Sequence, residues 1–420
     1  MNLLKKHSVI ALSYFLLIAV LGVLLRCFSI IAIDFNYKYL VHAHSHVALL
    51  GWVYTALMIL IYLLFLKSID LEKKYRRVFW FTQITIIGML ITFPFTGYAL
   101  FSILFSTLFL FASYIFSYLV FKHTPKQLKT TNSYKCIKWS LWYMIISSLG
   151  PWALGIIMNT LGETSSWYRN AIYFYLHFQY NGWFILALFG ILFRVFEKHH
   201  INISSIVFKR FFYLFNSGII ITFLISILWM KLSFVINIIA VLGGLIQIIA
   251  FIILLKEIIQ QKEKIYTIFS NRVMKLFKII VFLFSIKLFM QFVGSFPSVS
   301  NTISFTIDFV IGYLHWIFLG IVSLSLLVFM HFFKLLRLTK SSIIIYLIGF
   351  FLTEILIFYR GFSIWRIIET SDYYNHYLFF ASVLFLVSIS FILFNKKKKN
   401  SINNKNENGV LKNIFYSSTA

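Results

Sequence analysis

The chain is dominated by uninterrupted apolar runs of roughly 20 residues or more, and this feature constrains its fold most strongly. A helix of about 20 apolar residues spans the hydrocarbon core of a bilayer. Apolar residues make up 60% of the chain and charged residues only 12%. Because lipid cannot hydrogen-bond the backbone, such runs must form helices or a closed barrel, and their lack of alternation favours helices. We therefore predict an all-α polytopic membrane protein.

Twelve runs are long enough to cross a bilayer, and the loops between them alternate in charge. Basic residues gather in every second loop and in the tail from Lys396. This bias predicts a multi-pass protein of the bacterial inner membrane with both termini in the cytoplasm. We predict a twelve-helix domain over 1–395 and, because residues 396–420 are polar and repetitive, a disordered tail. The predicted spans are 8–33, 40–66, 77–97, 99–121, 138–160, 170–195, 208–230, 233–255, 273–296, 303–330, 341–362 and 373–394.

The net charge of +26 is explained by membrane topology rather than by a nucleic-acid partner. The basic residues lie in short loops between apolar runs, which is the pattern that membrane topology produces. We therefore expect the lipid bilayer, and no nucleic acid, as the partner of this charge.

A short motif occurs three times in the chain. It consists of a histidine, four residues and a glycine, and it appears as "HVALLGW" from His46, "HFQYNGW" from His177 and "HWIFLG" from His315. The copies lie in the second, sixth and tenth predicted spans. Because four spans separate successive copies, all three have the same orientation in the membrane. The spacing predicts a pseudo-threefold 4+4+4 arrangement of parallel repeats.

The histidines divide into two groups by predicted depth. We interpret His7, His123, His199, His200 and His331 as solvated loop residues near the inner surface, whereas the other six fall in the outer half: His42, His44, His46, His177, His315 and His376. We expect the imidazoles of the three motif histidines to face one shared cavity. Neutral imidazole can bind iron or copper without adding charge to lipid. The alternative is that these side chains only hydrogen-bond neighbouring helices.

This architecture resembles the catalytic subunit of the heme–copper oxidases and nitric-oxide reductases. In that family, histidines of spans two and ten clamp a low-spin heme, another span-ten histidine holds a second heme, and histidines of spans six and seven hold copper. The stretch "HAHSHVALLGWV" also resembles a tenth-helix motif of some high-affinity oxidases, although it lies in span two here. The resemblance implies heme, of b type, as cofactor, with copper as a further possibility.

The resemblance implies roles for particular residues. His46, or His42 one turn earlier, matches the span-two heme ligand. His315 matches a span-ten heme ligand, and His177 matches the span-six copper ligand. His44 is a further metal-ligand candidate, because it or Tyr313 would have to replace a missing ligand. Span seven contains no histidine, so two copper ligands of the family are absent.

Other polar residues also fall within or beside apolar spans. Lys287 and Gln291 lie one turn apart in span nine, and Glu354 lies at a comparable depth in span eleven. They are candidates for a proton route, and the alternative is a structural Lys–Glu pair. Arg360 and Arg366 lie around the outer end of span eleven, where arginines bind heme propionates in the family that the chain resembles.

These features lead to three hypotheses. The first is a heme-binding oxidoreductase of heme–copper oxidase type that transfers electrons or reduces O2 or NO, or a variant that no longer reduces oxygen. Cytochrome c or quinol and other membrane subunits would then be its partners. The second is a cation or metal permease, in which His42, His44 and His46 capture the ion and Lys287 with Glu354 couples protons. The third is a sensor or assembly factor.

Overall fold

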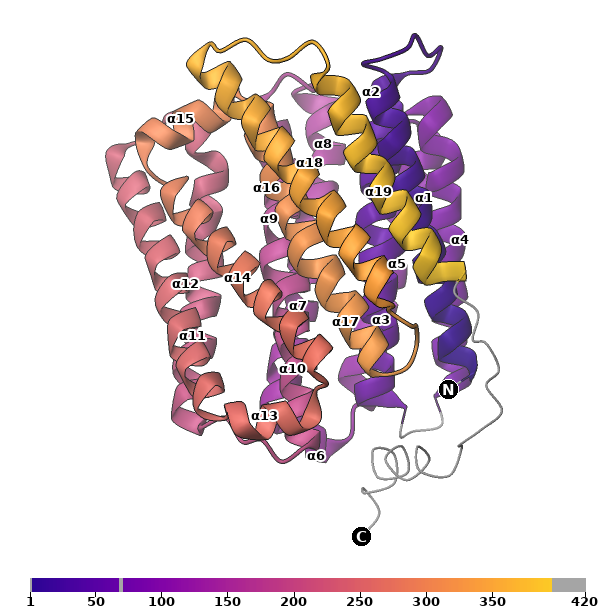
Figure 1. Cartoon of the computed structure of the whole chain (residues 1–420), viewed down its shortest axis with the longest axis vertical. Coiled ribbons are helices and arrows are strands. Elements are labelled where there is room, and N and C mark those ends of the chain that lie inside the picture. Colours follow the sequence, from indigo (N-terminus) through magenta and orange to yellow (C-terminus); the bar gives the residue numbers. More distant parts are fainter. Residues whose placement is uncertain (1, 68–70, 395–420) are drawn as a thin grey trace.

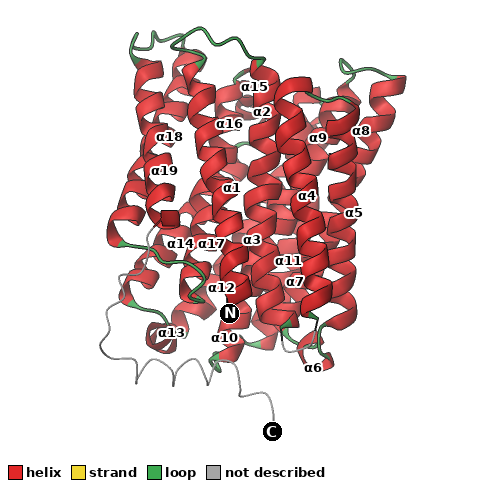
Figure 2. Cartoon of the chain, turned by 90° about the vertical axis from the view of Figure 1, so that its right-hand side faces the viewer, coloured by secondary structure: helices red, strands yellow, loops and turns green. Residues whose placement is uncertain are grey.

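The chain folds into a bundle of long helices, shown by a computed structural model that describes residues 2–67 and 71–394 (Figures 1 and 2). Twelve helical segments of the described chain are long and apolar enough to cross a membrane. The predicted class, an all-α polytopic membrane protein, is therefore confirmed. The predicted disordered tail, 396–420, lies outside the described residues.

The twelve spans follow the chain in order, and four of them combine α-helix with π-helix or 3₁₀ segments. We call the end of the bundle that carries the N-terminus the lower end and the opposite end the upper end. The spans are α1 (Asn2–Cys27); α2 (Tyr37–His46), η1 (Val47–Tyr54), α3 (Thr55–Ile61) and η2 (Tyr62–Leu66); α4 (Glu72–Thr96); α5 (Leu100–His123); α7 (Asn132–Ser147) with α8 (Leu149–Thr160); α9 (Ser166–His177), η3 (Phe178–Phe184) and α10 (Ile185–Lys198); α11 (Ser205–Thr222) with η4 (Phe223–Met230); α12 (Phe234–Gln260); α14 (Asn271–Val293); α16 (Ile307–His315), η5 (Trp316–Ser323) and α17 (Leu324–Phe332); α18 (Lys340–Arg366); and α19 (Tyr374–Phe394). Short helices α6 (Lys126–Lys129), α13 (Lys262–Ile268) and α15 (Pro297–Phe305) lie between spans.

The first span is displaced from its prediction. It begins at Asn2 rather than at residue 8, because the exposed side chains of Lys5 and Lys6 reach outward from its first turns. His7 consequently lies inside the helix. Its ring stacks on Phe79 with 3.6 Å between ring centroids, and its Nδ1 lies 3.1 Å from the Tyr75 hydroxyl. The prediction that His7 is a solvated loop residue was wrong.

The spans form three equivalent groups of four. In each group the first span packs on the π-helix of the second, as α1 does on η1, α7 on η3 and α14 on η5. The third and fourth spans of each group are also neighbours, in the pairs α4–α5, α11–α12 and α18–α19. Contacts of α5 with α7, α12 with α14 and α19 with α1 close the ring. This pattern confirms the predicted pseudo-threefold 4+4+4 arrangement.

The second span of each group lies at the centre of the bundle. In the most apolar stretches of spans two, six and ten, 100%, 83% and 67% of the residues are buried, against at most 50% in any other described span. These inner spans also contact one another, through η3 with η5 and through α3 with α10 and α17. The other nine spans therefore separate them from lipid.

Each inner span changes from α-helix to π-helix directly after its motif histidine. The π-helices begin at Val47, Phe178 and Trp316. The motif glycine lies within each of them and admits a neighbouring ring: a Cβ on Gly182 would lie 2.5 Å from Tyr143, and one on Gly320 would lie 2.5 Å from Phe350. π-helices are rare and often occur at functional sites. The sequence repeat is therefore also a structural repeat.

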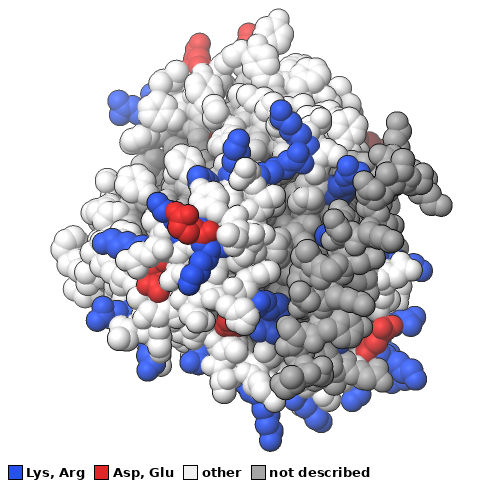
Figure 3. Space-filling model, turned by 60° about the horizontal axis from the view of Figure 1, so that its bottom comes forward, with Lys and Arg blue, Asp and Glu red and all other residues white. Residues whose placement is uncertain are grey.

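The two ends of the bundle differ in charge. Lys and Arg side chains surround the lower end (Figure 3). The loops and the helix start at the upper end carry few cations but hold acidic residues: Asp34, Glu163, Asp308, Glu369 and Asp372. Such a difference in Lys and Arg content between the two ends is typical of multi-pass membrane proteins, whose loops on one side of the membrane are enriched in basic residues.

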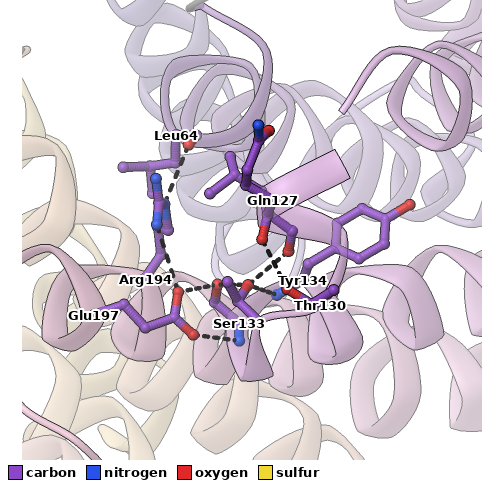
Figure 4. Close-up of polar contacts among 9 residues, drawn as sticks. Leu64, Gln127, Thr130, Ser133, Tyr134, Arg194 and Glu197 are labelled. Carbon is purple, nitrogen blue, oxygen red and sulfur yellow. Dashed lines mark hydrogen bonds and ion pairs between the residues drawn. The ribbon is translucent and has the colours of Figure 1, made fainter. Parts of the chain in front are cut away.

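A polar cluster at the lower end joins three spans (Figure 4). Glu197 of α10 accepts hydrogen bonds from the backbone N–H of Ser133, at 2.9 Å, and from its hydroxyl, at 2.5 Å. Arg194 pairs with Glu197 at 3.6 Å and donates to the carbonyl of Leu64 at 3.5 Å. Since Ser133 lies in the first turn of α7, the carboxylate also stabilises that helix terminus.

Replacement of Glu197 by alanine should destabilise the bundle. It leaves the partly buried Ser133 donors and Arg194 without their acceptor, so the free energy of unfolding should fall by about 1–3 kcal/mol. Thermal unfolding in detergent measures this change in the free energy of unfolding. The exposed Glu263 of α13 provides a matched control, and equal effects of Glu197→Ala and Glu263→Ala would contradict the prediction.

Candidate functional site

The three histidines at the start of span two point to different neighbours. His46 lies against α4 and the α4–α5 connection, with its ring centroid 4.3 Å from that of Phe93. Its Nδ1 donates to the carbonyl of His42 at 2.9 Å, and its Nε2 lies 3.4 Å from the Tyr98 hydroxyl. The ring of His42 also packs on Tyr98, at 4.6 Å between centroids. Both nitrogens of His46 therefore have protein partners.

His44 faces α1 instead. A Cβ built on Gly22 would lie 3.3 Å from its Cε1, so the ring occupies the space that the glycine leaves. The Nδ1 of His44 is buried and has no hydrogen-bond partner among the described residues. Successive residues of a helix are rotated by about 100°, so His44 cannot share the face of His42 and His46.

His315 of α16 is the motif histidine that comes near His44. The charge of His44 acts on His315, and Arg26 acts electrostatically on both imidazoles. None of the hydrogen bonds between described residues involves the ring of His315. We call His44 and His315 the upper histidine pair. It joins two of the three inner spans.

Charged side chains surround Arg26, which lies one turn beyond Gly22 on α1. Its charge interacts with those of Asp308 and Arg360. Arg360 pairs with Asp308 at 3.7 Å and lies over the ring of Tyr374, 5.4 Å from its centroid. Arg26 and Arg360 therefore both interact with Asp308, and the role of Arg360 and Arg366 in holding an anionic group stays a prediction. Arg366 is exposed at the end of the helix, over Trp365.

Glu354 lies on α18 with only 1% of its surface exposed. Neither carboxylate oxygen has a hydrogen-bond partner among the described residues, and Arg26 is the cation that acts on it. The alternative of a structural pair between Glu354 and Lys287 is wrong. Lys287 donates to Asn181 of span six, whereas Glu354 has no hydrogen-bond partner among the described residues and interacts with the charge of Arg26.

Lys287 stands at the centre of a buried chain of neutral polar groups. Its Nζ donates to Asn181 Oδ1 at 2.6 Å and to Gln291 Oε1. Gln291 also donates to Gln247 Oε1 at 3.0 Å and accepts from the Tyr313 hydroxyl at 3.3 Å. We call this chain, which extends to His177, the lysine network. It confirms that Lys287 and Gln291 share one face of α14.

His177 ends the lysine network. Its Nε2 lies 2.8 Å from the carbonyl oxygen of Ile219, which can only accept, so Nε2 carries the proton. Its Nδ1 then accepts from the amide of Asn181 at 3.2 Å. Both ring nitrogens of His177 are therefore engaged, one of them by a backbone carbonyl of span seven.

The three motif histidines do not meet at one site. His46 packs on α4, His177 is held within the lysine network, and His315 approaches His44. Over residues 2–67 and 71–394, no group of three or more His, Cys, Asp or Glu side chains lies close enough to hold a metal ion. The expected shared cavity of three imidazoles is wrong, and a pair drawn from spans two and ten takes its place.

Arg26, Asn181 and Gln247 were not predicted as site residues. Each carried a signal in the sequence, because each is a polar residue within or at the end of a long apolar run. Asn181 lies within the second copy of the motif, directly before its glycine. A search for uncharged polar residues inside spans would have found Asn181 and Gln247.

The sequence matches no protein-family model, and no curated protein resembles it significantly. The class that the fold defines is a multi-pass membrane protein with an upper histidine pair and a buried lysine network.

Lys287→Met should destabilise the protein, because it leaves the amide oxygen of Asn181 buried without its donor and removes one of the two donors to Gln291. We expect a loss of about 1–3 kcal/mol in the free energy of unfolding. Adding Asn181→Leu should cost less than the sum of the two single changes, since both partners are then removed. Unfolding of the two single variants and the double variant in detergent measures these free-energy losses. Replacement of the exposed Lys278 of the same helix by methionine is the control. Strictly additive losses would show that the two side chains do not interact.

Proposed function

We propose that the chain is a membrane heme-binding protein, similar in architecture to the catalytic subunit of the heme–copper oxidases, that takes part in electron transfer or in reduction of a small oxidant such as O2 or NO. The observation that carries the proposal is the upper histidine pair. The charge of the His44 imidazole in span two acts on the His315 imidazole in span ten, and neither His44 Nδ1 nor the ring of His315 has a protein hydrogen-bond partner among the described residues.

The residues of this pair fit a heme. His44 and His315 would hold the iron of such a heme through their imidazoles, a ligand type that heme proteins use. Neutral imidazoles add no charge to the apolar interior. When bound, a heme of b type supplies one-electron redox chemistry, whose potential depends on its axial ligands and burial.

The arginines of the upper end fit the carboxylates of such a group. Arg26 acts on both histidines, and Arg360 lies beside it. A guanidinium donates hydrogen bonds in pairs and suits carboxylate oxygens. Asp308 pairs with Arg360 and offsets part of the positive charge of the two arginines. We therefore assign Arg26 and Arg360, rather than Arg366, to hold anionic substituents.

A copper ion does not fit the residues present. His177, its candidate ligand, has both ring nitrogens engaged, and the described residues offer no cluster of three ligands. Copper therefore takes no part in the proposed chemistry. This mismatch favours electron transfer by a single heme over a complete oxygen-reducing centre.

The charge asymmetry supports an orientation. The basic lower end, with the N-terminus, would face the cytoplasm of a bacterium, and the upper histidine pair would lie in the outer half of its inner membrane. Cytochrome c or quinol are the electron donors that this placement allows, and further membrane subunits could assemble on the lipid-facing spans.

The purified protein should show the Soret and α bands of a heme in a reduced-minus-oxidised spectrum. His44→Ala and His315→Ala should each abolish or strongly weaken these bands, whereas His46→Ala should retain them, because His46 faces α4. The exposed His376→Ala serves as control. A colourless protein from cells supplied with ample heme would overturn the proposal, and metal-dependent uptake by vesicles would favour the permease instead.

Filling the space at Gly22 should perturb the same spectrum. A Cβ there lies 3.3 Å from the His44 ring, so the side chain of Gly22→Leu must displace that ring. We expect lower heme occupancy or a shifted α band. Gly155→Leu on α8 is a matched control, because a Cβ at Gly155 meets nothing within 4 Å. Identical spectra of the two variants would place the heme ligand elsewhere.

A further inference from the structure

A groove of about 420 Å³ lies between the lower ends of α4 and α5, on the side of the bundle that Figure 2 presents. Three exposed cations stand at its rim: Lys74 and Arg77 of α4, and Lys122 of α5. Its walls one or two turns further into the membrane are apolar, and include Phe81 and Ile115. The groove is therefore amphipathic along its length.

The positive charge at the rim is not neutralised by the described part of the protein. None of the ion pairs between described residues involves Lys74, Arg77 or Lys122. The charges that act on the neighbouring His123 are those of lysines. Lys122 donates to the hydroxyl of Tyr118 at 2.8 Å, which holds its ammonium along the groove wall. The rim thus offers clustered cations that have no ion-pair partner among residues 2–67 and 71–394.

The order of the groove residues matches the order of groups in a phospholipid. Phe81 follows Arg77 by one helical turn toward the bilayer centre, a rise of about 5.4 Å. Ile115 lies about two turns from Lys122 in the same direction. A phosphate at the rim would therefore place its acyl chains directly against the apolar walls. Basic pockets between transmembrane helices bind anionic headgroups in this way.

We propose that this groove is a binding site for an anionic phospholipid, whose phosphate is held by Lys74, Arg77 and Lys122 and whose acyl chain packs on Phe81 and Ile115. The proposal is independent of the heme proposal, because no residue of the upper histidine pair or lysine network takes part. It assigns a lipid-selective site to a surface that would otherwise be covered by any lipid.

Native mass spectrometry of the full chain in detergent tests the site. The probes are phosphatidylglycerol and phosphatidylcholine with the same acyl chains. We expect phosphatidylglycerol to bind on the order of 10-fold or more tightly, because each cation near the headgroup adds to the attraction. The triple variant Lys74→Gln, Arg77→Gln, Lys122→Gln should lose this preference.

Three controls separate the alternatives. Lys256→Gln, Lys262→Gln, Lys264→Gln removes the same charge from the lower end around α12 and α13 and should leave the preference intact. Phe81→Trp keeps the rim cations but enlarges a side chain in the groove wall, and should weaken binding of phosphatidylglycerol. Equal binding of the two lipids to the unmodified protein, or equal losses in both triple variants, would overturn the proposal. Displacement of phosphatidylglycerol by inorganic phosphate at comparable concentration would show a simple anion site instead.

Discussion

Every polar group in the hydrocarbon region must find its partner within the protein, and the whole arrangement depends on this constraint. The nine outer spans remove three inner spans from lipid, and the polar contacts of the centre lie on or around those three. Trp52 of η1 donates to the hydroxyl of Ser323 in η5 at 2.8 Å, which joins spans two and ten directly. Trp316 donates to the carbonyl of Leu283 at 2.9 Å. Such bonds hold the inner spans in register, and the buried Nδ1 of His44, which has no hydrogen-bond partner among the described residues, contrasts with them.

The sequence predicted the architecture well because hydropathy and repeat spacing both depend on local composition. The count of spans and their grouping in fours are both present in the structure, whereas the central position of the motif helices became known only from the structure. The boundaries of the first span were less accurate, since lysine side chains can reach water from inside a helix and hide its true start.

The candidate site was harder to predict because it depends on the rotation of each helix about its axis. His42, His44 and His46 fall within five positions, yet a rotation of about 100° per residue sends His44 toward α1 and His46 toward α4. A span that is apolar on every side gives no hydrophobic face from which to determine that rotation. Here the most apolar stretch of span two is buried on every side, so the sequence could not indicate which histidine lies toward span ten.

The partners of the buried charged side chains were equally difficult to predict from the sequence. Lys287 and Glu354 are at similar depth, and opposite charge alone favoured pairing them. The structure instead gives Lys287 the amide oxygen of Asn181, which lies 106 positions away along the chain. Amide dipoles can stabilise an ammonium without a carboxylate, and a single sequence does not indicate which distant residues will meet.

The three copies of the motif share the features that pack the inner spans but differ in the partners of their histidines. All three keep the glycine that admits a neighbouring ring and the π-helix after the histidine, so these features serve the packing of the inner spans. The histidines themselves differ: His177 is fixed by a carbonyl and an amide, His46 by a carbonyl and Tyr98, and His315 by neither. A repeat maintained by packing predicts where helices lie, whereas the capacity to bind a ligand depends on which imidazoles the packing leaves unpaired. That distinction is why the upper histidine pair includes only one motif histidine and takes its second member, His44, from outside the repeat.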